Sequence, residues 1–300
     1  RLKDEDVLTH LVQTSAHAYL LFFTNRGRVY RLRAHRVPML DRTARGTAIV
    51  NLLELDADEE VEAIIDTRDY ETNRFLFFCT KGGTVKKTNF TEYDKNLKGG
   101  FIALGLKDGD ELVRVIPTNT GDDLFVTSAR GQTIRFSEDE VRPMGRTAAG
   151  VRGLKLREGD YVVGCDVVRE DGFLLVMSER GFGKRTEPHH FGTKGRGGLG
   201  MRSMKVNEER GEVVGALVVD EGDDIFVINS SGVVIRTRVS EISIQGRDAT
   251  GVRIMNLDEG DVVAAIAPAP ASEDDLIDSE ETDAEAASVA EDGPTDEAEA

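Results

Sequence analysis

The chain contains no tryptophan, only two cysteines (Cys79 and Cys165) and only seven prolines in 300 residues. Each cysteine lies inside an apolar run, so we expect buried, reduced thiols and no disulfide framework. No apolar run approaches the roughly eighteen residues that a membrane-spanning helix needs, and the opening residues RLKDED lack the layout of a signal peptide. These absences predict a cytoplasmic protein without membrane contact.

Acidic residues outnumber basic ones by 55 to 38, which gives a net charge of −17, but the excess is concentrated at one end. Residues 271–300 carry 13 acidic residues and no lysine or arginine, so residues 1–270 are nearly neutral at −4. The acidic segment has almost no large apolar side chain and cannot bury enough surface to offset its conformational entropy. We therefore expect one folded domain over residues 1–270 and a disordered acidic tail over residues 271–300.

Five short apolar runs each lead into a turn glycine, and these glycines are 56, 48, 50 and 51 residues apart. The runs are rich in β-branched and aromatic residues and are bounded by turn formers, which is typical of β-hairpins. A cation stands four residues after each turn glycine, and a second glycine follows the cation by fifteen residues in four repeats and by thirteen in the other. The turn glycines are Gly27, Gly83, Gly131, Gly181 and Gly232, the cations are Arg31, Lys87, Arg135, Arg185 and Arg236, and the second glycines are Gly46, Gly100, Gly150, Gly200 and Gly251.

Repeats of about fifty residues, each with about four short strands, bury their faces against one another and close radially. Residues 1–8 match the last part of a repeat, where Gly-Asp precedes an apolar strand at Gly109, Gly159 and Gly260. The sequence thus predicts an all-β fold, a six-bladed β-propeller-like pinwheel of four-stranded repeats whose first blade is incomplete in this chain. An open β-solenoid is the alternative, although its coils are usually much shorter.

The second glycine closes a basic, glycine-rich heptad that is clearest at Lys194–Gly200, KGRGGLG. Missing side chains let such a loop approach a phosphate backbone, and the cations supply charge. At any single repeat, an ordinary glycine-rich turn with solvated arginines would look the same. Cations at a fixed phase in every repeat, however, would line one rim of a closed disc, which favours an extended polymer of phosphates as the partner.

Competing sites are weak in this sequence. Residues 195–200 lack the Lys-Ser/Thr and the helix that a nucleotide-binding loop requires. His189 and His190 are neighbours in a predicted loop, and the other three histidines lack partners at metal-ligand spacing, so we expect no metal site. The tyrosines at positions 19, 30, 70, 93 and 161 are interpreted as packing residues.

Several strings resemble the C-terminal domain of the A subunit of bacterial DNA gyrase, a six-bladed pinwheel that wraps DNA. The resemblance covers nearly everything before the acidic tail and rests on RGRVY at 26–30, ARG at 44–46, GTVKKT at 83–88 and RTRVSEISI at 236–244. In that family the first blade carries a basic heptad that begins with glutamine. By the register of the repeats, we expect that heptad to lie upstream of Arg1, and Lys194–Gly200 is interpreted as a second, box-like copy with lysine for glutamine.

The resemblance implies duplex DNA as the ligand. It implies two protein partners, the gyrase B subunit together with the N-terminal region of the gyrase A subunit. It implies no cofactor on this chain, with ATP and Mg²⁺ on other parts of a type IIA topoisomerase whose active-site tyrosine lies in the N-terminal region. The chain would wrap DNA in the nucleoid without catalysing a reaction alone. The alternatives are the corresponding C-terminal domain of topoisomerase IV and a protein-binding propeller.

The predicted site consists of cations from the repeats and from one glycine-rich loop. The cations expected to contact DNA are Arg31, Arg42, Arg45, Lys87, Lys98, Arg135, Arg146, Arg152, Arg185, Lys194, Arg196, Arg202, Arg236, Arg247 and Arg253. The box-like loop comprises Lys194, Gly195, Arg196, Gly197, Gly198, Leu199 and Gly200.

Overall fold

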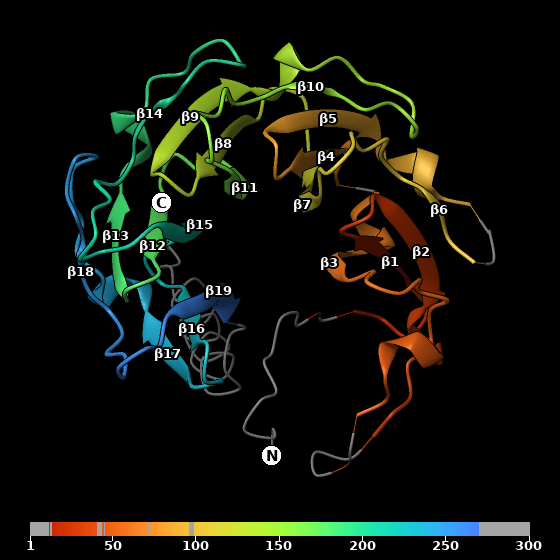
Figure 1. Ribbon diagram of the computed structural model, residues 1–300. Coiled ribbons are helices and arrows are strands. Elements are labelled where there is room, and N and C mark those ends of the chain that lie inside the picture. Colours follow the sequence, from red (N-terminus) through yellow and green to blue (C-terminus); the bar gives the residue numbers. More distant parts are fainter. Residues whose placement is uncertain are drawn as a thin grey trace, which may run out of the picture.

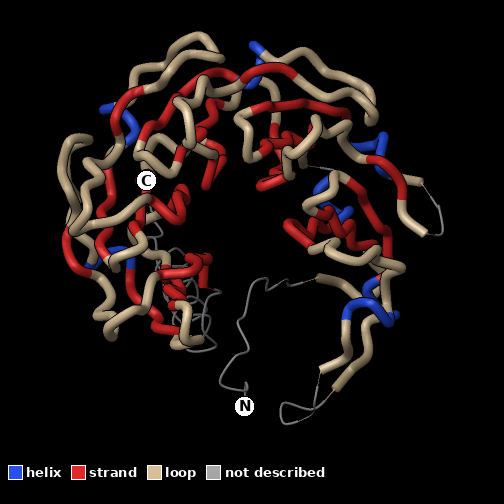
Figure 2. The backbone as a smooth tube through the Cα atoms, viewed as in Figure 1, coloured by secondary structure: helices blue, strands red, loops and turns tan. Residues whose placement is uncertain are grey.

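The computed structural model describes residues 12, 14–40, 44, 46–70, 72–95 and 99–269. It shows five small antiparallel sheets, or blades, arranged in sequence order along an arc around a common centre (Figure 1). Strands and connecting loops make up almost all of this arc, and the helices are isolated short turns (Figure 2). The separate sheets confirm an all-β, propeller-like fold and exclude a continuous solenoid.

Within each blade the strands have the same order, from an innermost strand near the centre of the arc to an outermost strand (Figure 1). The first blade contains β3 (Val61–Asp66), β1 (Tyr19–Thr24), β2 (Arg28–Arg33) and β6 (Phe101–Ile102), and the second contains β7 (Leu112–Thr118), β4 (Phe75–Thr80), β5 (Thr84–Asn89) and β10 (Val151–Arg152). The third contains β11 (Val162–Val167), β8 (Asp123–Ser128), β9 (Gln132–Ser137) and β14 (Met201–Arg202), and the fourth contains β15 (Val213–Val219), β12 (Phe173–Ser178), β13 (Phe182–Thr186) and β18 (Val252–Arg253). The fifth contains β19 (Val263–Ala269), β16 (Asp224–Asn229) and β17 (Val234–Arg238).

The helices are 3₁₀ turns of three or four residues, and five of them follow the second strand of a blade. They are η1 (Ala34–Arg36), η2 (Ile49–Asn51), η3 (Thr67–Tyr70), η4 (Phe90–Tyr93), η5 (Glu138–Glu140), η6 (Pro188–His190) and η7 (Val239–Glu241). Within the described ranges, no helix is long and apolar enough to cross a membrane.

The outermost strand of each four-stranded blade is supplied by the following repeat. β6 belongs to the second repeat in sequence, yet it pairs with β2 of the first blade, with Val29 opposite Phe101. β10, β14 and β18 pair in the same way with β5, β9 and β13. The sequence repeat is therefore offset from the blade by one strand, and backbone hydrogen bonds tie each blade to the next repeat.

The fifth blade has three strands, because no later repeat in the described part of the chain supplies its outer strand. The structure shows five blades, so the predicted count of six is not confirmed. Residues 1–8, on which the prediction of a further blade rested, lie outside the described residues, as does the acidic segment 271–300.

The hydrophobic core lies between the blades. Leu76 and Phe78 on one face of β4 pack with the first blade, whereas Phe77 and Cys79 on the other face pack with the third. Because successive side chains of a strand point to opposite faces, a strand enclosed by two blades needs apolar residues at every position. This explains the continuous apolar runs in the sequence. Cys79 and Cys165 are buried free thiols, as predicted.

Candidate nucleic-acid interface

Three predicted arginines lie at matching positions on the outer edge of the arc. Arg152, Arg202 and Arg253 are the second residues of β10, β14 and β18, the exchanged outer strands of blades two to four, and all three are exposed. Arg202 forms an ion pair of 3.2 Å with Asp248, and the guanidinium of Arg253 lies 4.6 Å from the centre of the Phe182 ring. β10, β14 and β18 lie on the outer side of the arc (Figure 1), so strand exchange gives each of three consecutive blades one arginine on its outer strand.

The glycine-rich loop of the fourth repeat lies on the third blade. The Lys194 amide donates to the Arg135 carbonyl at 2.9 Å, the Gly197 amide donates to the Gly153 carbonyl at 2.6 Å, and the Gly198 carbonyl accepts from the Lys155 amide at 2.8 Å. These backbone contacts bring the loop to the outer edge just before β14 begins at Met201.

Two glycines of this loop are required by the conformation and packing of the loop itself. Gly197 and Gly200 have φ of +80° and +71°, values that other residues rarely adopt. A Cβ atom at Gly200 would lie 2.6 Å from the Thr133 carbonyl oxygen, so a side chain here would disrupt the approach to β9. The sequence favours glycines that open the loop to phosphate, but Gly200 is required by packing within the protein.

Within this loop, Lys194 and Arg196 differ in their surroundings. Lys194 is exposed, and its side chain has no hydrogen bond or ion pair to any residue that the structure describes. Arg196 is partly buried: its Nε donates to the Glu140 carbonyl at 3.1 Å and its Nη1 to the Arg152 carbonyl at 3.1 Å. Lys194 is therefore free to contact a ligand, whereas Arg196 also fixes the loop.

The arginine at the third heptad position ties neighbouring outer strands together. Arg146, Arg196 and Arg247 each donate from Nη1 to a carbonyl of the exchanged strand before them, at 2.9, 3.1 and 3.4 Å. The acceptors are the carbonyls of Ile102, Arg152 and Arg202. Three equivalent contacts show that the repeated arginine has a structural role, which its sequence pattern alone did not reveal.

The cations that stand four residues after each turn glycine do not form an exposed rim. Lys87 and Arg185 are buried, so the prediction that they line an open positive rim is wrong. The side chains of Arg31 and Arg135 are only 10% and 11% exposed, and Arg236 is exposed at 37%. The alternation of side chains along β2, β5, β9 and β13 turns these cations toward protein rather than toward solvent.

Each of these strand cations pairs with an acidic residue. Arg31 pairs with Asp94 at 2.6 Å, Arg185 with Glu221 at 3.1 Å and Arg236 with Asp224 at 2.5 Å. Lys87 pairs with the buried Glu138, and Arg135 pairs with Asp123 at 2.7 Å and also with Glu170. Burial raises the pKa of Glu138, although its pairing with Lys87 acts in the opposite direction.

Three predicted contact residues, Arg42, Arg45 and Lys98, lie outside the described residues. The structure therefore places the other twelve in three environments. Arg152, Lys194, Arg202 and Arg253 are exposed at the outer edge, Arg146, Arg196 and Arg247 are partly buried ties, and Arg31, Lys87, Arg135, Arg185 and Arg236 are strand cations with acidic partners.

Two buried lysines do not stand out in the sequence. Lys86 and Lys184 stand three residues after Gly83 and Gly181, and both are almost completely buried. Burial, with the nearby charge of Arg146, lowers the pKa of Lys86 to about 7, and burial lowers the pKa of Lys184 to about 8. In the string KK at 86–87, alternation along β5 sends the two side chains to opposite faces, a signal that could have separated their roles.

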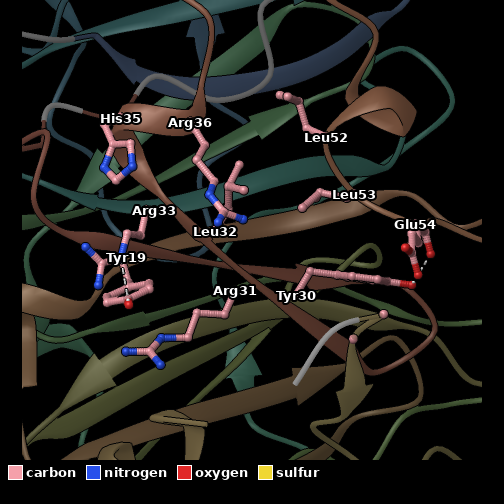
Figure 3. Close-up of a pocket in the computed structure, with 12 residues that line it drawn as sticks. Tyr19, Tyr30, Arg31, Leu32, Arg33, His35, Arg36, Leu52, Leu53 and Glu54 are labelled. Carbon is pink, nitrogen blue, oxygen red and sulfur yellow. Dashed lines mark hydrogen bonds between the residues drawn. The ribbon is translucent and has the colours of Figure 1, made fainter. Parts of the chain in front are cut away.

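A cavity of about 750 Å³ lies on the first blade, where it is lined by residues of β1, β2 and the segment 52–54 (Figure 3). In it, the guanidinium of Arg31 stacks 3.6 Å from the centre of the Tyr19 ring, and Arg33 donates to the Tyr19 hydroxyl at 2.8 Å. The Tyr30 hydroxyl donates to the Glu54 carbonyl at 2.9 Å and is 2.8 Å from a Glu59 carboxylate oxygen. Tyr19 and Tyr30 thus have the packing roles that the sequence predicted.

A known protein family matches this chain once in each of its five repeats. A family model described as DNA gyrase C-terminal domain, beta-propeller, matches residues 18–68, 74–119, 122–169, 172–220 and 223–270. Each matched segment contains the first hairpin of one blade and its innermost strand.

Two curated relatives match almost the whole chain. The DNA gyrase A subunit of Mycolicibacterium smegmatis is 41% identical over 289 residues, which is 95% of this chain and 34% of that protein. The DNA gyrase A subunit of Salmonella typhimurium is 43% identical over 291 residues, which is 97% of this chain and 33% of that protein. The chain thus spans about a third of the length of these relatives.

Two solved structures share the fold. The structure of a DNA gyrase A C-terminal domain matches with a TM-score of 0.74 at 28% identity, over 85% of this chain and 83% of that one. The C-terminal domain of a DNA topoisomerase IV matches with a TM-score of 0.82 at 26% identity, over 95% and 89%. The five family matches and the 41–43% identity over nearly the whole chain show that this chain belongs to the DNA gyrase C-terminal domain, beta-propeller, family.

Proposed function

We propose that the chain binds duplex DNA along the outer edge of its blades and bends the duplex around the arc. The observation that carries this proposal is the series Arg152, Arg202 and Arg253, one exposed arginine at the same outer-strand position in three consecutive blades. Lys194 adds a free ammonium group beside this series. A curved row of cations without base-reading elements suits a phosphate backbone, so binding should be largely independent of DNA sequence.

Bending sets the number of contacts that are needed. Turning about forty base pairs through half a circle costs on the order of 10 kcal/mol elastically, so many distributed phosphate contacts must offset it. Repetition along the arc supplies contacts in this way, because each of blades two to four adds a cation at the same place.

The bent duplex would serve a larger enzyme. We infer that the chain is part of DNA gyrase and presents DNA to the gyrase B subunit, together with the N-terminal region of the gyrase A subunit, with ATP and Mg²⁺ bound outside this chain. Such a complex would act on the nucleoid in the cytoplasm. A sixth blade, completed by residues upstream of β1, would extend the row of contacts.

The proposal is tested with the full chain and a fluorescent forty-base-pair duplex across a salt series. We expect steep weakening with salt, because each phosphate contact releases counterions. The triple variant Arg152→Ala, Arg202→Ala, Arg253→Ala should lower the magnitude of the log–log salt slope by about 3. A matched control removes three exposed arginines away from the exchanged outer strands: Arg68 and Arg169, which follow the innermost strands β3 and β11, and Arg74, which precedes β4.

The two triple variants remove equal charge and so separate a local contact from a general electrostatic effect. Equal losses in both would contradict an interface at the outer edge. A flat dependence of affinity on salt in the parent chain would contradict DNA binding altogether and favour a protein-binding propeller.

The topoisomerase IV domain is the second candidate, because its structure superimposes over 95% of this chain. Sequence favours gyrase, since the relatives at 41–43% identity are both gyrase A subunits. Negative supercoiling by the holoenzyme that contains this domain would support the gyrase assignment. Decatenation without supercoiling would support the other.

A further inference from the structure

One surface turn brings three potential metal ligands together. Glu187 precedes η6, and η6 ends with His189 and His190. The Nε2 atoms of His189 and His190 lie 3.9 and 3.8 Å from the same Glu187 oxygen, Oε2, and the ligand atoms of all three residues lie within 4.8 Å of one another. The centres of the two imidazole rings are 4.2 Å apart, and the rings are tilted by 33° relative to each other. Both histidines therefore place a nitrogen within 4 Å of the same carboxylate oxygen.

The turn that carries these side chains is anchored on both sides. Pro188 and Phe191 are buried, and the Phe191 amide donates to the Pro188 carbonyl at 2.9 Å. Arg135 from the third blade donates to the same carbonyl at 3.3 Å. Because the backbone of this turn is already ordered, the turn loses less conformational entropy when its side chains bind an ion.

The spacing fits a tetrahedral ion with little adjustment. Zinc binds histidine nitrogen at about 2.0–2.1 Å and carboxylate oxygen at about 2.0–2.2 Å, which places tetrahedral ligands about 3.3–3.5 Å apart. The two nitrogen–oxygen separations need to shorten by only about half an ångström. We propose that Glu187, His189 and His190 bind a divalent transition-metal ion of the zinc class at the protein surface, with water completing the coordination.

Calorimetric titration of the full chain with Zn²⁺ tests this site. The parent should bind one zinc ion that the double variant His189→Gln, His190→Gln loses, and Glu187→Gln should weaken binding at least about tenfold. His35→Gln is the matched control, because His35 is an exposed histidine on the equivalent turn η1. Weak binding of Zn²⁺ to the carboxylates of residues 271–300 would add equally to all variants, because none of the substitutions lies in that segment.

Cobalt gives a spectroscopic readout. Co²⁺ should produce visible ligand-field absorption in the parent and in His35→Gln, but not in the double variant. Identical zinc isotherms for the parent and the double variant, or identical cobalt spectra, would overturn the proposal.

The buried lysines carry a second, independent inference. Lys86 Nζ donates to the carbonyls of Ala103 and Arg146, both at 2.6 Å, and to that of Gly145 at 3.4 Å. Lys184 Nζ donates to the carbonyls of Gly246 and Arg247. Both lysines therefore reach the equivalent heptad backbone of the next repeat.

Core packing does not explain a lysine at this position. Ile134 and Ile235 occupy the same place, three residues after Gly131 and Gly232, in other repeats. Burial of an amine lowers stability unless the amine is hydrogen-bonded. The hydrogen bonds that Lys86 and Lys184 donate to backbone carbonyls offset this cost. In the repeats that have lysine at this position, its side chain therefore hydrogen-bonds to the heptad backbone of the following repeat.

We infer that Lys86 and Lys184 are positioning residues that fix the heptad loops carrying Arg146 and Arg247 for contact with DNA. This inference rests on the proposed function and on the sequence-based prediction that Arg146 and Arg247 contact DNA in addition to their contacts with the neighbouring outer strands. It implies that Lys86 affects DNA only through the loop at Gly145 and Arg146.

A double-mutant cycle on the full chain tests the inference. Lys86→Met should weaken DNA binding about threefold to tenfold, and should have no further effect when Arg146→Ala is present. Ile134→Met is the matched control at the equivalent position and should bind as the parent does. Hydrogen exchange at the amides of residues 145–149 should be faster in Lys86→Met, even without DNA.

The outcomes separate the two proposals. If Arg146→Ala binds DNA as the parent does, the assignment of Arg146 to the interface fails, and this inference with it. If Arg146→Ala weakens binding but Lys86→Met does not, or weakens it equally in both backgrounds, positioning fails while the interface stands. Unchanged hydrogen exchange in Lys86→Met would also overturn the positioning role.

Discussion

Two sets of cations recur at fixed positions in the repeats, and they differ in their surroundings. The strand cations, Arg31, Lys87, Arg135, Arg185 and Arg236, pair with acidic residues of the protein, and two of them are buried. The edge cations, Arg152, Lys194, Arg202 and Arg253, are exposed on the outer strands and the glycine-rich loop. The second set is the more accessible to a ligand, because its side chains are exposed and, among the described residues, only Arg202 of this set has an ion pair, with Asp248.

The difference shows what repetition does and does not indicate. A residue that recurs at the same position of each repeat can be required for packing, for strand exchange or for ligand binding. The groups that surround its side chain distinguish these roles. The Glu138 carboxylate beside Lys87 indicates a structural cation, whereas the solvent around Lys194 indicates a cation that can bind a ligand.

The largest expected effect lies in stability. Lys87→Met leaves Glu138 buried without its partner and should lower the free energy of unfolding by about 3–5 kcal/mol. Arg236→Met removes a partly exposed pair and should cost less than about 1 kcal/mol. Chemical denaturation of the full chain compares the two, and equal losses would remove the distinction between buried and exposed strand cations.

The pH dependence of stability is the next largest effect. Lys86 has a pKa of about 7 in the folded chain and an ordinary value of 10.5 without burial, so the unfolded chain binds more protons between these values. Stability from this residue is therefore fully present above 10.5 and is lost as the pH falls toward 7. From pH 7 to pH 9 the parent should gain about 1–2 kcal/mol more than Lys86→Ile.

Denaturation at several pH values measures this gain, with Ile134→Leu as a control whose curve should run parallel to that of the parent. Parallel curves for the parent and Lys86→Ile would show that Lys86 does not titrate in this range.

DNA affinity should respond to the edge cations. Lys194→Ala should weaken binding about fivefold to tenfold at low salt and reduce the magnitude of the log–log salt slope by about 1, with unchanged stability. The double variant Lys194→Ala, Arg196→Ala should weaken binding more than Arg42→Ala does. If circular dichroism shows the double variant unfolded, these residues serve the fold and not the interface.

The smallest expected effect comes from the acidic segment. Its 13 carboxylates are tethered to the same chain, so we expect them to compete with phosphate for the edge cations. Deletion of residues 271–300 should tighten DNA binding about threefold at low salt, and the gain should shrink as salt screens the charges. Equal affinities at low salt would show that the segment does not reach the edge cations.

The repeat and its hairpins could be predicted from sequence because their signals are local. Turn glycines such as Gly83 and Gly131 recur with a regular spacing, and continuous apolar runs identify strands enclosed between blades. Strand exchange could not be predicted, because outer strands such as Val151–Arg152 have only two residues and carry no periodicity. The offset between repeat and blade follows from that exchange.

The candidate site was predicted only in part, for a similar reason. Lys87 and Glu138 are 51 positions apart, so their pairing depends on how one blade packs against the next. A local signal existed, since Asp94 and Glu138 fall within or just after the short turns that follow the strands with cations. The ties from Arg146, Arg196 and Arg247 also depend on contacts across blades.

The exchange of one strand between each blade and the following repeat affects how the number of blades in such a domain can change. Every described junction has the same donor, a two-residue outer strand, and the same acceptor, the second strand of a hairpin. Duplication of one repeat in a gene would leave both halves of every junction intact, and loss of one repeat would rejoin a donor to an equivalent acceptor. The number of blades, and with it the length of DNA that the arc could follow, can thus vary between descendants without new contacts having to evolve.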